Sequence, residues 1–200
     1  MAYTPCATSQ LQACIVKDCL HPAFEGLEEL GIIFPKSGTT TIVRATSSSE
    51  KNNIVSITPS SESSDIKVIT ASGETAFAGT TEEFDASTKR WTKTVTIIVP
   101  AHGSAFSAKV IEAMTANRDG FVIVLQRKDT NNDCAFPVIG SERGAVLTAA
   151  TLDYNDSATG GCYTLTFTES GAPSAEIDLF NTDYAKTKGA FDALVAGASC

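Results

Sequence analysis

The 200-residue chain has few of the residues that carry enzyme chemistry. Its only histidines are His21 and His102, and it contains no Gly-x-Ser-x-Gly elbow, phosphate loop or dinucleotide fingerprint. Ser104 follows His102 closely, but a catalytic triad is a spatial arrangement with a third orienting group, so closeness in sequence does not indicate one. We therefore predict that the protein is not an enzyme and uses no cofactor.

Long apolar stretches and an N-terminal basic segment are also missing. The longest apolar run is Phe121–Leu125, whereas a membrane-spanning helix needs about 20 apolar residues. We therefore expect no membrane partner. Met1–Gln10 holds no Lys or Arg and no apolar stretch follows it, which is not typical of a secretory signal. We expect the protein to fold in a cytoplasm, where thiols usually stay reduced.

Acidic residues exceed basic ones. The chain has 15 Lys and Arg against 23 Asp and Glu, a formal net charge of -8. Binding to a phosphate backbone requires cations that replace condensed counterions. The composition therefore disfavours a protein that wraps nucleic acid and is compatible with a surface that must not hold it. The simpler interpretation, that the charge keeps the chain soluble, stays open.

Six cysteines are present, three of them near one histidine. Cys6, Cys14, Cys19 and His21 are zinc-ligand types, but only Cys14 and Cys19 approach the spacing of structural sites. A Cys14–Cys19 disulfide formed after release from the cell is an alternative. We favour free thiols that fill small apolar spaces and predict no metal.

A second metal-like pattern is Asp129–Asp133. Its oxygens stand at positions one, three and five of a calcium loop. Position six holds Cys134 in place of glycine, and position twelve holds Gly140 in place of glutamate. The segment therefore predicts a polar hairpin turn.

The chain divides into three parts by composition. Residues 1–38 predict an irregular segment or N-terminal arm, with one or two helical turns within Pro22–Leu30 and an end at Pro35. Residues 39–170 predict a β domain, because short runs rich in Val, Ile and Thr alternate with polar clusters. Residues 171–200 predict a C-terminal extension with a short helix over Asp183–Ala196.

A long hairpin is predicted over Glu74–Val99, with its turn at Asp85–Lys89. Its return strand alternates, placing Trp91, Lys93, Val95, Ile97 and Val99 on one face. Its arms are longer than the usual five or six residues. We consider two outcomes: the hairpin pairs with another chain, or it folds back on its own sheet.

One amphipathic helix and several strands are expected after this hairpin. Ser104 is a candidate N-cap, and Phe106, Val110 and Met114 recur at helical spacing, so one side of the helix should rest on a sheet. Phe121–Leu125 predicts a strand covered on both faces. The remaining strands are expected over the segments Thr40–Ala45, Ile54–Ile57, Ile66–Thr70, Cys134–Ile139, Gly144–Tyr154 and Cys162–Thr168.

The last of these strands carries threonine on one face. Thr164, Thr166 and Thr168 alternate with Tyr163, Leu165 and Phe167. A threonine face is either wet or shared with another subunit. Our candidate inter-subunit residues are therefore drawn from the hairpin turn and this strand: Asp85, Ser87, Lys89, Trp91, Thr164 and Thr166.

The order of elements from Gly73 to Thr168 resembles a known family. The Thr-rich strand Trp91–Pro100 is followed by a helix, an apolar strand and an Asp/Asn turn. Phe136–Gly140, Gly144–Ala149 and the closing Gly161–Thr168 come next. This series resembles the tail tube proteins of tailed bacteriophages, particularly a type seen in phages of Bacteroidetes hosts.

The resemblance implies a mainly β, tail-tube-like sandwich or small barrel flanked by one helix. It implies hexameric rings that stack into a tube whose lumen conducts the genome. The partners would be the chain itself, other tail proteins, and DNA that passes without specific binding. The protein would be assembled in the host cytoplasm and located in the virion tail.

Three rival functions remain at this stage. A tube of a contractile injection or type VI-like system would share the fold and carry effectors instead of DNA. A β-sandwich binding module would display aromatics in a shallow site, and the single Trp91 on an alternating strand disfavours it. A hydrolase lacks a catalytic constellation.

Overall fold

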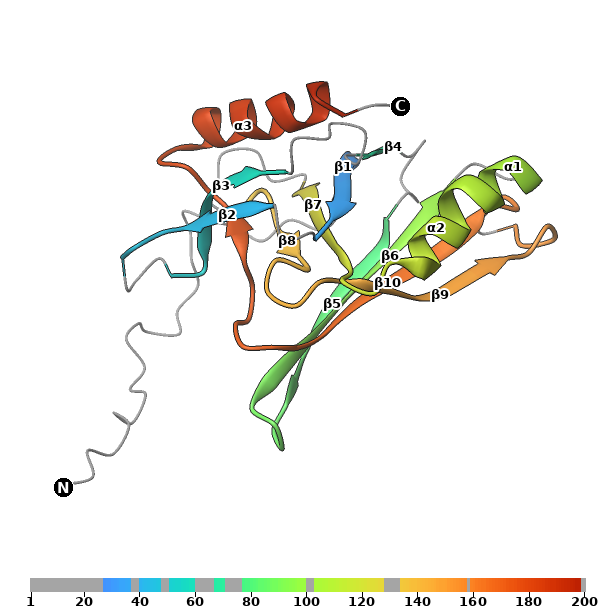
Figure 1. Cartoon of the computed structure of the whole chain (residues 1–200), viewed down its shortest axis with the longest axis horizontal. Helices are drawn as coiled ribbons and strands as arrows, with labels where there is room; N and C mark the ends of the chain where they lie inside the picture. Colours follow the sequence, from blue (N-terminus) through green and yellow to red (C-terminus); the bar gives the residue numbers. More distant parts are fainter. Residues whose placement is uncertain are drawn as a thin grey trace.

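The computed structural model describes residues 27–36, 40–47, 51–59, 67–70, 77–99, 103–127, 134–157 and 159–198. Within these ranges the chain is mainly β and forms three open sheets (Figure 1). A barrel was one of the two expected architectures, and it is wrong for the described residues because none of their sheets closes on itself. The candidates His21, Cys6, Cys14, Cys19, His102 and Asp129–Asp133 lie outside the described residues.

The central sheet has the strand order β4-β1-β7-β8. Its strands are β4 (Lys67–Thr70), β1 (Leu27–Pro35), β7 (Phe121–Arg127) and β8 (Val138–Ile139). All its neighbouring strands are antiparallel. As expected, β8 follows the apolar strand β7 in sequence and pairs with it.

The long sheet has the order β5-β6-β10-β9 and is antiparallel throughout. Its strands are β5 (Phe77–Asp85), β6 (Arg90–Val99), β10 (Tyr163–Ala172) and β9 (Val146–Leu152). The expected hairpin is therefore confirmed as β5 and β6, and it pairs within its own sheet through β6 and β10. The strand expected over Cys162–Thr168 is β10, which begins at Tyr163 and continues four residues beyond the predicted end at Thr168.

The small sheet has the order β11-β3-β2. Its strands are β11 (Asp178–Leu179), β3 (Asn53–Thr58) and β2 (Thr41–Arg44). The C-terminal helix α3 (Tyr184–Ala196) confirms the expected short helix. Asp183 is its N-cap and accepts the backbone N–H of Lys186 at 2.8 Å.

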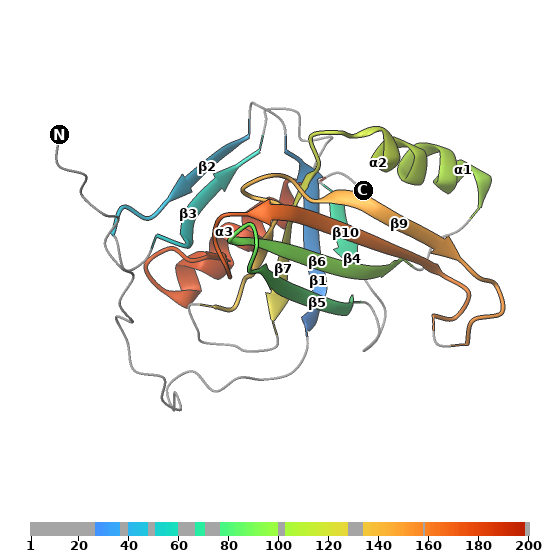
Figure 2. The same ribbon diagram turned by 90° about the horizontal axis from the view of Figure 1, so that it is seen from below.

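The central sheet lies between the long sheet on one side and the small sheet with α3 on the other, which explains why residues 121–125 of β7 are all apolar. Phe121, Ile123 and Leu125 belong to a core cluster shared with the long sheet. Val122 and Val124 belong to a second cluster shared with the small sheet and α3. Alternation along β7 therefore supplies both cores, so both faces of this strand are covered as predicted. In Figure 2 the strands of the central sheet run across those of the long sheet.

The expected amphipathic helix is confirmed over residues 104–116. It consists of α1 (Ser104–Phe106), a π-helical segment (Ser107–Ile111) and α2 (Glu112–Ala116). Ile111 lies in the core shared with the long sheet, and Phe106 and Met114 pack against it. Ser104 is the first helical residue and not the N-cap. Gly103 occupies the N-cap with φ 110°, a backbone conformation that favours glycine.

The prediction of an irregular segment is wrong for residues 27–35, and the prediction of helical turns within Pro22–Leu30 is wrong for residues 27–30. These residues form β1, which lies between β4 and β7 in the central sheet. Ile32, Ile33 and Phe34 are buried and divide between the two cores. Burial on both faces of the strand outweighed the local features that favoured an irregular arm.

Candidate assembly surface

The turn of the β5–β6 hairpin is held by one carboxylate. Asp85 Oδ1 accepts the Ser87 backbone N–H at 2.8 Å and the Ser87 hydroxyl at 2.6 Å. Asp85 Oδ2 accepts the Thr88 hydroxyl at 2.8 Å. These hydrogen bonds lower the pKa of Asp85 to about 2, and the bond from the Ser87 hydroxyl contributes most to the shift. Lys89 closes the turn with a positive φ of 57°.

An aromatic pair stands just behind this turn. The ring centroids of Phe84 and Trp91 are 5.2 Å apart, and the Lys89 ammonium lies 5.8 Å from the Phe84 centroid. Every residue from Gly79 to Arg90 is exposed, with Phe84 at 49%. The hairpin projects beyond the body of the molecule (Figure 1). The adjacent Phe84 and Trp91 rings on a projecting hairpin make this turn a candidate contact site.

The outer face of the long sheet is lined with threonine. Thr96 pairs with Thr166, and their hydroxyl oxygens are 3.5 Å apart. The Thr148 hydroxyl lies 3.0 Å from that of Thr168 and donates to the Thr166 carbonyl at 3.1 Å. The outward positions of β6, β9 and β10 that make up this threonine face are Thr92, Thr94, Thr96, Ile98, Val146, Thr148, Ala149, Thr151, Thr164, Thr166, Thr168 and Ser170.

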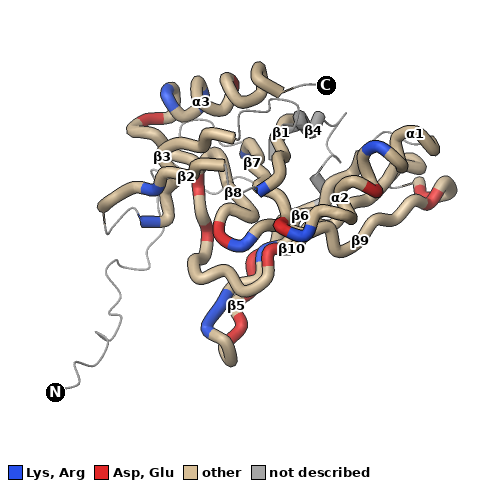
Figure 3. Tube along the Cα trace, in the orientation of Figure 1, with Lys and Arg blue, Asp and Glu red and all other residues tan. Residues whose placement is uncertain are grey.

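This threonine face carries no charged side chain. The β9 sequence contains none, and in Figure 3 its tube is tan. The only charged residue of β10 is Glu169, which points to the opposite face. The threonine face is therefore an uncharged surface that carries hydroxyl groups.

Two charged residues occupy the inner face of the same sheet. Lys93 and Glu169 are each 0% exposed and are directly opposite on β6 and β10. The Lys93 ammonium donates to the Ala175 carbonyl at 2.7 Å. On the other side of Lys93, β5 places Glu82 opposite it. Loss of hydration raises the pKa of Glu82 and the Lys93 ammonium opposes that rise.

Glu169 also organises the turn that joins the central and long sheets. Its Oε2 accepts the Gly140 N–H at 2.8 Å, and its Oε1 accepts the N–H groups of Glu142 and Arg143 at 3.0 and 2.6 Å. The N–H of Arg143 and its neighbours thus surround one carboxylate, as in a backbone anion nest. Hydrogen bonds to an ionised acceptor are stronger than those between neutral groups, so this buried carboxylate anchors the turn to the sheet.

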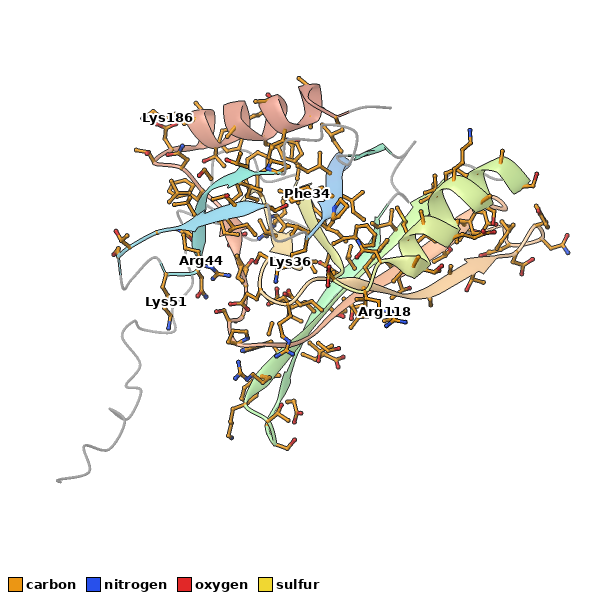
Figure 4. All side chains as sticks on the ribbon, in the orientation of Figure 1. Phe34, Lys36, Arg44, Lys51, Arg118 and Lys186 are labelled. Atoms are coloured by element: carbon orange, nitrogen blue, oxygen red, sulfur yellow. The ribbon has the colours of Figure 1, made fainter. Side chains whose placement is uncertain are left out.

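The same turn is tied to the small sheet. The Glu142 carboxylate accepts the Ser174 backbone N–H and hydroxyl at 3.2 and 2.9 Å. Arg44 Nη2 of β2 lies 3.3 Å from Glu142 Oε1, and the Lys36 ammonium donates to the Glu142 carbonyl. Figure 4 labels both cations on this side of the molecule. The turn therefore fixes the threonine face relative to the rest of the fold.

The six predicted inter-subunit residues fall into two groups. Asp85, Ser87, Lys89 and Trp91 come together at the hairpin turn. Thr164 and Thr166 lie on the threonine face of β10, with Thr164 opposite Ile98 near the other end of β6. The structure does not bring the two groups together.

Sequence reasoning missed Phe84 and Glu169, although signals for both were present. A four-residue turn after Asp85 places Phe84 opposite Trp91. The alternation that turns Leu165 and Phe167 inward also turns Glu169 inward. The N–H groups that donate to Glu169 had no local signal, because they come from a turn 26 to 29 residues earlier in the chain.

Across the described ranges, no group of three or more His, Cys, Asp or Glu is placed to hold a metal ion. No described helix is long and apolar enough to span a bilayer. The described Cys162 is a free thiol.

Neither a family model, a curated protein sequence nor a solved structure matches this chain.

Proposed function

We propose that the chain is the structural subunit of a bacteriophage tail tube. Copies join side by side into rings, hexameric in the family that the sequence resembles, and the rings stack in the virion tail. The lumen conducts the genome. The observation that carries this proposal is the long sheet, which combines a neutral hydroxyl face with two open edges.

The open edges supply the lateral contact. In the described part of the long sheet, β5 and β9 are the outer strands and each has a neighbour on one side only. Unpaired strand edges readily template another chain. When β5 of one copy pairs with β9 of the next, the sheet continues from subunit to subunit. The subunits close into a ring when the rotation that relates neighbouring copies is a whole fraction of 360°.

The threonine face supplies the wall. DNA carries one negative charge per about 1.7 Å of its axis, so a basic wall would hold it through released counterions. Apart from Arg90 at the turn end of β6, the outward side chains of β6, β9 and β10 contain no Lys or Arg. A ring whose inner surface is this face offers hydroxyl groups and no cations, and the net charge of -8 acts in the same direction. DNA passes such a wall without being bound.

Electron microscopy of the purified protein tests the proposal as a whole. We expect rings and tubes that become more frequent as the protein concentration rises. A protein that stays monomeric by light scattering at every concentration and salt would contradict it. Tubes whose wall is lined by a strongly positive surface would instead favour the effector-carrying tube of an injection system.

Cysteine cross-linking tests the lateral contact. In the variant Thr81→Cys, Ala149→Cys the new thiols stand on the two opposite edges of one sheet, about 16 Å apart, because three strand spacings and an offset of two residues along the strands separate them. A disulfide needs Cα atoms within about 7 Å, so it forms only between copies. We expect an oxidised ladder on a denaturing gel, and its highest rung gives the ring size.

The two single variants, Thr81→Cys and Ala149→Cys, are the matched controls for native thiols. The pair Glu83→Cys, Thr151→Cys tests a neighbouring register of the same contact between β5 and β9. If none of these pairs gives a ladder longer than the single variants do, β5 and β9 are not joined.

A further inference from the structure

The lateral contact of the proposed function covers the open side of β5, and Glu82 stands on that strand. We propose that joining β5 of one copy to β9 of the next takes up a proton at Glu82, so that mild acid strengthens ring formation and alkaline pH weakens it. This regulation rests on the proposed function, because the contact that it controls is the lateral contact of the ring.

Glu82 lies at the edge of the inner face of the long sheet. It stands directly opposite Lys93 on β6, and Lys93 stands directly opposite Glu169 on β10. Directly opposite residues of an antiparallel pair share a face, so the three side chains form a row that runs from the edge into the core. Lys93 and Glu169 are fully buried, whereas Glu82 is exposed in the single copy, where β5 is an outer strand of the described sheet.

The charges around Glu82 are weighted toward acid. The Lys93 ammonium favours an ionised Glu82, while the carboxylates of Glu176 and Glu169 oppose it. Arg127 of β7 lies 3.6 Å from Glu176, so its charge serves that carboxylate. Loss of hydration is the largest effect, and it raises the pKa of Glu82 already in the single copy. The ionised form of Glu82 therefore depends on the water that remains at the open edge of β5.

The partner edge offers no cation in exchange for that water. The seven residues of β9 include no charged side chain, and the β9 tube is tan in Figure 3. The positions of β9 that point to the inner face are Leu147, Ala150 and Leu152. Glu82 therefore meets uncharged, apolar side chains in every register that keeps the two inner faces on one side. Transfer of a carboxylate from water to such surroundings favours its protonated form.

This coupling fixes the sign of the pH dependence. Glu82 holds its proton more tightly in the ring than in the single copy, so the lateral contact is strongest below the pH at which the single copy releases that proton. The contact weakens as the pH rises, until Glu82 is ionised in the ring as well. Between these two limits each contact takes up at most one proton, and its association constant falls by up to about tenfold per pH unit.

Glu83 provides a matched control on the same strand. It stands opposite Thr92 and therefore points to the threonine face, away from Lys93 and Glu169. In the proposed ring this face borders the lumen, so the Glu83 carboxylate keeps its water when β5 and β9 join. Glu82 and Glu83 carry the same charge at neighbouring positions, and only Glu82 loses hydration in the contact.

Sedimentation of the full chain between about pH 5 and pH 8, at constant ionic strength, tests the proposal. We expect the wild-type association constant to be highest at the acid end and to fall toward the alkaline end. Glu82→Gln mimics the protonated carboxyl group, so its rings should persist over the whole range, while Glu83→Gln should keep the wild-type profile. Histidines titrate in the same range, and both variants retain His21 and His102, so their contribution cancels in the comparison.

Dilution calorimetry counts the protons directly. Rings that dissociate on dilution release the protons taken up in assembly, and the heat of this release differs between buffers of different ionisation enthalpy. At the steepest part of the wild-type profile, Glu82→Gln should release up to about one proton per copy fewer than the wild type. Equal proton release by the two proteins would overturn the inference.

The Thr81→Cys, Ala149→Cys ladder separates this inference from the proposed function. If neither ladder nor rings form at any pH, the proposed function fails and the regulation falls with it. If ladder and rings form but Glu82→Gln follows the wild-type pH profile, or Glu83→Gln flattens it equally, the lateral contact stands and the role of Glu82 is wrong. Glu82→Gln rings that persist at a pH where wild-type rings have dissociated support the inference.

Discussion

Lys93 and Glu169 face each other across β6 and β10, and neither side chain is exposed to solvent. Each also bonds to the backbone of a loop: the Lys93 ammonium to the Ala175 carbonyl, and the Glu169 carboxylate to three N–H groups of the 140–143 turn. The inner face of the long sheet therefore holds two loops by charge, while the threonine face on its other side carries no charged side chain.

Removing the Glu169 carboxylate should destabilise the fold. In Glu169→Ala three backbone N–H groups lose their acceptor and Lys93 stays buried, so we expect the free energy of unfolding to fall by about 3–5 kcal/mol. Glu169→Gln keeps a carbonyl acceptor and should cost less. Urea unfolding measures both. Glu176→Ala, which removes the half-exposed partner of Arg127, is the control and should cost less than about 1 kcal/mol. A Glu169→Ala protein as stable as this control would contradict the anchoring role.

Gly140 should not tolerate a side chain. Its φ is +86°, and a Cβ atom there would collide with the Phe121 carbonyl oxygen and lie 2.8 Å from the Ala145 nitrogen. We expect Gly140→Ala to lower the free energy of unfolding by about 2–4 kcal/mol. Gly189→Ala in α3 meets nothing within 4 Å and should raise stability by about 0.5–1 kcal/mol. Thermal unfolding compares the two, and equal effects would show that the turn can move.

Glu82→Gln should change how stability depends on pH. The pKa of Glu82 is raised, so the folded state disfavours its charged form. The stability that the neutral form contributes is complete below its ordinary pKa of 4.5 and is lost as the pH rises through the raised value. Compared with the wild type, Glu82→Gln should therefore gain stability between pH 4 and pH 7. Denaturant unfolding at both pH values measures this, with Glu83→Gln as the charge-removal control.

Asp85 should affect the pH dependence of stability in the sense opposite to Glu82. Its pKa is lowered to about 2 from an ordinary 3.8, so its contribution is complete above 3.8 and is lost as the pH falls toward 2. NMR titration of the carboxyl carbon should give a midpoint near 2. Thr88→Ala removes one donor and should move that midpoint upward. A wild-type midpoint at the ordinary value would show that the turn is not closed in solution.

Local patterns were sufficient for the hairpin, the helices and the most buried strand. The alternation from Trp91 to Val99 defined one arm of the hairpin, and the unbroken Phe121–Leu125 run predicted a strand covered on both faces. These elements follow from a period of 2 or 3.6 residues that tertiary contacts did not override.

Elements that depend on distant partners were not predictable in this way. Leu27–Pro35 is a strand because it pairs with β7, some 90 residues later, as in Ile33 opposite Ile123. The same holds for Glu169, whose inward position follows from alternation but whose backbone donors lie in another turn. For the candidate assembly surface, the turn residues and the threonine strand were predicted from the sequence and stay a prediction, while the position of Phe84 opposite Trp91 required the register.

The pairing of β6 with β10 extends over nine residue pairs, from Trp91 opposite Ala172 to Val99 opposite Tyr163. A pull applied at the turn and resisted at the β9–β10 loop acts along these strands, so it loads the inter-strand hydrogen bonds together in shear instead of opening them one at a time. Such a pull would pass along the strands of the long sheet, so the small sheet and α3 would carry little of it.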